Sequence, residues 1–206
     1  RDAVAEALPR SHAAAGDARL DAWLSRYLDR APPRSRYLRD VAPALAAFVR
    51  DGRADDALDD PAWLRDALAY EALVHAVAYA PRAAPEPADE LSMGAPAVLA
   101  PTHARARLAH AVHRAPPGAA PEARPCALWI YRDDARHVVE TLELSPLAAD
   151  VLDALADREC TLTEAVTDAL SRHGGAASAA FVEGFAAFLE DLIERGVLRG
   201  SRPVIA

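Results

Sequence analysis

The chain has 206 residues and a mass of 21.9 kDa, enough for one large domain or two small ones with a real core. Its hydrophobic share of 52% and charged share of 26% are those of a globular protein and argue against intrinsic disorder. The 31 acidic residues outnumber 23 arginines, and Lys is absent, so the net charge of −8 argues against binding to nucleic-acid phosphates. Two unrelated cysteines, Cys126 and Cys160, exclude a disulfide scaffold and a CxxC zinc site.

The first half of the chain is predicted to be helical. An amphipathic stripe with the spacing i, i+3, i+4, i+7, i+8 is formed by Leu20, Trp23, Leu24, Tyr27 and Leu28. Two further helices are expected, over about 43–51 and 61–79, the last apolar nearly all round and therefore central in a bundle. A Pro-rich stretch at 81–90 follows, and we set the domain boundary near residue 95.

The second half changes its periodicity. Strands are expected over 105–112, 126–131 and 137–144, the last two joined by a short turn at 133–136. Three helices follow: one from Ser145, one from the capping box at Thr161, and one that ends at Gly196. We therefore predict a mostly helical α+β protein. A helical bundle (1–95) precedes a winged-helix-like domain (96–206) with a three-stranded antiparallel sheet and three helices.

Metal and catalytic sites are not predicted. His103, His110 and His113 lie within eleven positions, but alternation along a strand would put the last two on opposite faces. Glu71 and His75, at i, i+4 on one helix face, supply too few ligands for a catalytic metal, so we expect a buried structural pair. The sequence also lacks the motifs of nucleophilic hydrolases, P-loops and dinucleotide-binding folds, so we expect no catalytic residues.

The last helix allows two interpretations. In a winged-helix transcriptional regulator it would enter the DNA major groove, but it carries Glu183, Glu190, Asp191 and Glu194, which phosphates would repel. Alternatively, an extended peptide adds as a further strand to the open edge of the sheet and packs on this helix. The residues expected to bind such a peptide are His137, Val138, Val139, Glu140, Thr141, Leu142, Phe181, Phe185, Trp129 and Tyr131.

The residues at 99–102, 126–132, 144–152, 161–165 and 188–198 resemble the partner proteins of multinuclear non-haem iron oxidases. Those oxidases modify ribosomally made peptides, as in methanobactin and thiaglutamate pathways. The segments at 31–35 and 66–71 resemble the family's N-terminal domain.

The resemblance implies a non-catalytic subunit that forms a heterodimer with the oxidase and binds the leader of the precursor peptide. It implies no cofactor in this chain, because the iron would be held by the oxidase only. Neither nucleic acid nor membrane is an expected partner. No apolar run reaches the ~20 residues of a spanning helix and the first residues lack a signal-peptide core, so a cytoplasmic protein is expected. The alternatives are a winged-helix DNA-binding transcriptional regulator and a metalloenzyme acting alone.

Overall fold

The computed structural model describes residues 1–54, 61–84, 86–133, 136–175 and 178–203, with only the backbone described at Ala180. The chain divides into two compact units. The first comprises Arg1–Ala80 and Ala104–Ile130, and the second comprises Pro81–His103 and Tyr131–Ala206. The boundary predicted near residue 95 lies inside the first segment of the second unit. The prediction that residues 1–95 and 96–206 are separate folding domains stays a prediction.

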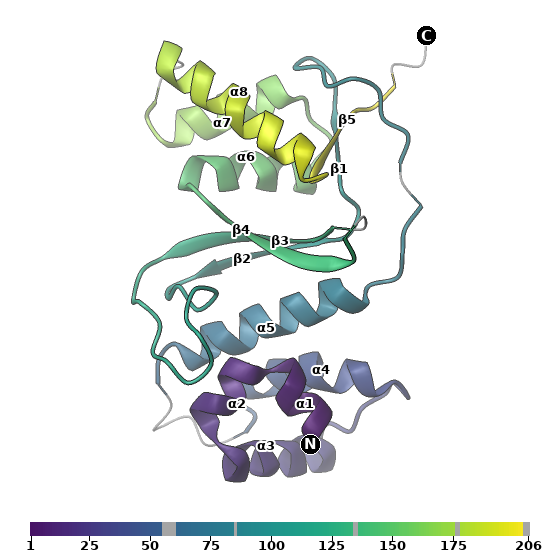
Figure 1. Cartoon of the computed structure of the whole chain (residues 1–206), viewed down its shortest axis with the longest axis vertical. Helices are drawn as coiled ribbons and strands as arrows, with labels where there is room; N and C mark the ends of the chain where they lie inside the picture. Colours follow the sequence, from purple (N-terminus) through teal and green to yellow (C-terminus); the bar gives the residue numbers. More distant parts are fainter. Residues whose placement is uncertain (55–60, 85, 134–135, 176–177, 204–206) are drawn as a thin grey trace. The chain divides into compact units, whose positions relative to one another are not determined.

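The first eighty residues of the first unit contain its helices (Figure 1). They are α1 (Asp2–Ala7), α2 (Pro9–Ala15), α3 (Asp17–Arg30), the short 3-10 helix η1 (Leu38–Asp40), α4 (Val41–Arg50) and α5 (Leu64–Tyr79). The three predicted helices are confirmed as α3, α4 and α5. Leu20, Trp23 and Tyr27 are buried as the stripe requires, whereas Leu28 is 51% exposed at the end of α3. Helices α1 and α2 were not predicted. The helix predicted from residue 61 begins at Leu64, and Asp60, its predicted cap, lies outside the described residues.

The predicted three-stranded antiparallel sheet is confirmed, and with it the mostly helical α+β fold class. Its strands are β2 (His103–Leu108), β3 (Cys126–Asp133) and β4 (Val138–Leu144), in the order β2-β3-β4. The first strand ends at 108 and not 112, because the amides of Ala109 and His110 donate to the carboxylate of Asp66 on α5. The predicted turn at 133–136 contains Asp134 and Ala135, which lie outside the described residues.

Three helices complete the second unit as predicted: α6 (Pro146–Asp157), α7 (Leu162–Arg172) and α8 (Ala179–Glu194). Their ends follow the sequence signals. The hydroxyl of Ser145 accepts the Ala148 N–H at 3.2 Å. Thr161 and Glu164 form the reciprocal capping box of α7. Gly196, with φ +69°, follows α8 in the left-handed conformation.

A short antiparallel ribbon in the second unit was not predicted. It pairs β1 (Ala97–Leu99) with β5 (Leu198–Ser201), which follows α8. The segment before β1 is tied to the same ribbon, because Asp89 and Ser201 exchange backbone hydrogen bonds of 2.8 and 3.2 Å. Gly200 has φ +135°, and a Cβ there would overlap the carbonyl oxygen of Asp89. The Pro-rich stretch is therefore held in place at Asp89.

Candidate functional site

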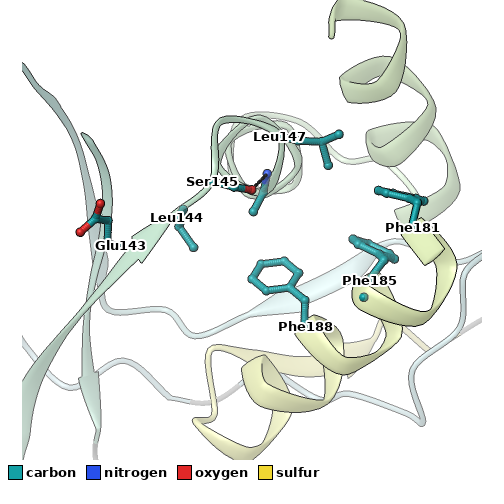
Figure 2. Close-up of a pocket in the computed structure, with 9 residues that line it drawn as sticks. Glu143, Leu144, Ser145, Leu147, Phe181, Phe185 and Phe188 are labelled. Carbon is teal, nitrogen blue, oxygen red and sulfur yellow. Dashed lines mark hydrogen bonds between the residues drawn. The ribbon is translucent and has the colours of Figure 1, made fainter. Parts of the chain in front are cut away.

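The second unit contains an apolar pocket of about 310 Å³ beside the end of β4. One wall comes from the junction of β4 and α6, and the other comes from α8 (Figure 2). The lining residues are Glu143, Leu144, Ser145, Leu147, Ala148, Phe181, Gly184, Phe185 and Phe188.

The α8 wall is a row of three aromatic rings. Phe181 and Phe185 are stacked with centroids 5.6 Å apart and planes at 12°, and Phe188 lies 6.2 Å from Phe185. Spacings of three and four residues place these rings on one face of the helix. All three are half-buried, and the first two also pack on the helical core of this unit. One side of the row therefore stabilises the fold while the other is available to a ligand.

The opposite wall is formed by Leu144, Ser145 and Leu147, which face the aromatic row (Figure 2). The Ser145 hydroxyl already caps α6, so the polar part of this wall has a structural partner. Gly184 adds room to the pocket, because a Cβ at this position would meet no atom within 4 Å. The pocket can therefore accept an apolar side chain and offers few fixed polar contacts.

Strand β4 leads directly into this pocket and lies at one end of the sheet order. In the part of the chain that the structure describes, it pairs only with β3. Its residues from 139 to 144 are half-buried, and Val138 is 42% exposed. His137 precedes the strand with φ +58°, and its Nδ1 lies 3.0 Å from Nη2 of Arg82. In the described sheet β4 is therefore an edge strand, and its end meets an apolar recess.

The predicted peptide-binding residues have three different environments. Phe181 and Phe185 line the pocket, while Val138, Val139, Glu140, Thr141 and Leu142 lie earlier along β4 and His137 just before it. Trp129 and Tyr131 are only 1% and 2% exposed, because β3 is the central strand and both side chains fill the core. These two rings support the sheet from within, so we do not expect them to contact a peptide directly.

Seven of the nine lining residues were not predicted: Glu143, Leu144, Ser145, Leu147, Ala148, Gly184 and Phe188. Phe188 could have been found, because it lies three residues after Phe185 on the same helix face. The approach of the α6 start to α8 carries no local sequence signal, since it depends on how the helices pack.

His110, His113 and Glu71 have structural partners in the first unit. Asp66 Oδ2 lies 2.8 Å from Nδ1 of His110, and the ring of His113 packs edge-on against Tyr70. Glu71 is buried as expected but does not pair with His75: it accepts hydrogen bonds from the start of α2. The Nε2 of His75 instead lies 2.7 Å from the carbonyl oxygen of Arg39. The expected Glu71–His75 pair is therefore wrong, because α2, which the sequence analysis did not predict, supplies better donors.

No group of three or more His, Cys, Asp or Glu side chains is arranged to hold a metal ion in the part that the structure describes. Within the same residues, no helix combines the length and the apolar character that crossing a membrane requires.

Comparison with known families gives one result for the region that contains the pocket. Residues 100–193 match the HvfC C-terminal domain. The match includes the three strands of the sheet, α6, α7 and nearly all of α8, and thus every pocket residue. The resemblance noted above is supported for this region, while the match leaves out residues 1–99. No curated protein matches the chain.

Proposed function

We propose that this chain is a cytoplasmic, non-catalytic partner subunit of a multinuclear non-haem iron oxidase, and that it binds the leader of a ribosomally made precursor peptide. The HvfC-like region at 100–193 supports the class of protein. The observation that supports the peptide-binding role is the edge position of β4, whose end meets the half-buried row of phenylalanines on α8.

Recognition would combine two sources of affinity. The leader would add to β4 as a fourth strand, so that its backbone satisfies the N–H and C=O groups of the edge. An apolar side chain of the leader would then enter the pocket between Leu144 and Phe185, and so fix the register of the added strand. The strand contacts would tolerate many sequences, whereas the pocket would select for an apolar residue at one position.

In this proposal the chain holds and orients the peptide, and the oxidase binds the iron and performs the oxidation. Purification of the chain alone and with the oxidase, each followed by metal analysis, tests this division. We expect a one-to-one complex that contains iron and an isolated chain that does not. Stoichiometric iron in the isolated chain would contradict the proposal.

Filling the pocket tests the peptide site directly. Gly184→Leu would place a side chain in the recess, where a Cβ meets no neighbouring atom, so the fold should tolerate it. We expect at least about a tenfold loss of affinity for a fluorescein-labelled leader peptide, since an anchor pocket contributes more than about 1.4 kcal/mol. Ala186→Leu is the matched control, because this residue is exposed on α8 and does not line the pocket. Equal affinities for the two variants would rule out the pocket as the anchor site.

A further inference from the structure

We propose that a second surface, in the first unit, docks the folded oxidase partner. This surface, here called the arginine–tyrosine patch, consists of Arg36, Tyr37, Leu38, Arg39, His75 and Tyr79. It fits a partner face that contains an apolar hollow edged with carboxylates. The inference rests on the proposed function and adds to it the place where the oxidase binds.

The patch concentrates the exposed apolar surface of the first unit. Leu38 is 67% exposed, Tyr79 54% and Tyr37 50%. Among the described residues of this unit, Leu28 is the other large hydrophobic side chain with comparable exposure, at 51%. Single exposed hydrophobic residues are normal on protein surfaces, but a group of them marks an interaction site.

Hydrogen bonds and ring contacts hold the patch together. Nε2 of His75 lies 2.7 Å from the carbonyl oxygen of Arg39, and the centroids of the His75 and Tyr79 rings are 4.6 Å apart. These contacts fasten the η1 segment to α5. Tyr37 is fixed locally as well, because its N–H donates to the Ser35 hydroxyl at 3.1 Å. A surface that is ordered before binding loses less entropy when a partner docks, which favours affinity.

The charge of the patch selects the chemistry of the partner. The guanidinium groups of Arg39 and Arg36 lie 4.8 and 5.6 Å from the centre of the Tyr37 ring. The first fifty residues contain nine Arg and six acids, although the whole chain has a net charge of −8. Asp40 lies 3.8 Å from Arg39 and offsets one of the two charges, so the patch keeps a net positive charge around its apolar centre. Carboxylates at the edge of the partner's contact face would be complementary to it.

The shape of the patch favours a folded partner over an extended peptide. Leu38, with two thirds of its surface exposed, projects outward and needs a hollow to be buried. Extended peptides instead bind in recesses such as the pocket beside β4. Tyr and Arg are also the residue types enriched at the energetic centres of protein interfaces.

The test uses co-expression of the full chain with its cognate iron oxidase and measures two affinities, for the oxidase and for the labelled leader. Leu38→Glu should weaken oxidase binding by at least about tenfold, because a carboxylate would enter an apolar hollow edged with acids. Leader affinity and the thermal unfolding midpoint should stay unchanged. Leu28→Glu is the matched control, since this side chain is similarly exposed in the same unit, and it should bind the oxidase normally.

The outcomes separate this inference from the function on which it rests. If the unmodified chain does not bind the oxidase, the proposed function and the docking site both fail. If it binds and Leu38→Glu binds equally well, only the docking site is overturned. Two further outcomes would also overturn the docking site. If folded Leu38→Glu loses affinity for the leader, the patch binds a peptide. If it loses self-association and keeps oxidase binding, the patch binds a second copy of the chain.

Discussion

One carboxylate oxygen of Glu71 accepts both the backbone N–H and the hydroxyl of Ser11, at 3.1 and 2.7 Å. The other oxygen accepts the Arg10 N–H at 2.6 Å. Arg10 and Ser11 lie in the first turn of α2, where backbone N–H groups have no partner within the helix. A side chain from α5 therefore caps a helix sixty residues earlier in the chain. Both Glu71 and Ser11 are buried, so this contact belongs to the core of the first unit.

Glu71 should give the stability of the protein an unusual dependence on pH. Burial raises the pKa of its carboxyl group, and the hydrogen bonds from Ser11 and Arg10 oppose the shift in part. A carboxyl group whose pKa is raised by folding binds more protons in the folded state, so its contribution to stability increases as the pH falls. We therefore compare the unfolding free energy of the unmodified protein with that of Glu71→Gln. The unmodified protein should gain stability relative to the variant as the pH falls from above that raised pKa to the ordinary value of 4.5.

Urea unfolding of both proteins at several pH values measures this difference. Because the two chains differ at one group, the titration of all other groups cancels. A difference that is constant with pH, or one that falls as the pH falls, would contradict the assignment of a raised pKa to Glu71.

Asp66 should be important for the link between α5 and the end of β2. Its Oδ2 accepts the N–H groups of Ala109 and His110 at 3.0 and 2.9 Å and contacts the His110 ring at 2.8 Å. Asp66→Ala should lower the unfolding free energy by about 1–3 kcal/mol, because two backbone donors lose their acceptor. Asp66→Asn should lose less, since its amide oxygen can still accept. Equal stability of Asp66→Ala and the unmodified protein in urea titrations would show that water replaces the carboxylate.

Gly200 and Gly184 should respond oppositely to the same substitution. Gly200→Ala should destabilise the protein by about 3 kcal/mol or more, because the added Cβ meets the Asp89 carbonyl and the backbone has positive φ. Gly184→Ala should instead stabilise it by up to about 1 kcal/mol, because Ala favours a helix interior and the site has room. Thermal unfolding of the two variants provides the comparison, and similar midpoints would contradict the close approach at Asp89.

Proline substitutions in β4 should distinguish its two edges. The N–H groups of neighbouring strand residues alternate between the paired side and the open side, so Val139 and Glu140 point theirs in opposite directions. One of Val139→Pro and Glu140→Pro should disrupt the sheet. The other should fold normally but lose leader binding, because it removes an edge donor. Circular dichroism and leader titration measure both properties, and unchanged affinity in the folded variant would exclude this edge.

Local signals in the sequence predicted much of the second half of the chain. The capping residues Ser145 and Thr161 act over three residues, so the helices that they begin form at the expected places. The strands β3 and β4 were also predicted closely, because each is a short run of β-branched, aromatic or alternating residues. These features depend on neighbours in the chain, which a sequence displays directly.

The first helices of the chain could not be predicted from local signals. Helix α2 is only seven residues long, and its capping acceptor is Glu71, far away in the sequence. Isolated helices of this length are marginal, so their stability comes from tertiary contacts that local patterns do not contain. The pairing of β1 with β5 has the same origin, because about a hundred residues separate the two strands.

The sequence by itself determined the helix stripes, the capped helix starts, the strands β3 and β4 and the acidic character of the chain. Only the tertiary structure decided which of these residues are accessible. It buried the Trp129 and Tyr131 side chains in the core, placed Phe188 beside the end of β4, and left Leu38 exposed. The physical reason is that periodicity assigns a residue to one face of an element, whereas the packing of elements distant in sequence decides whether that face is covered.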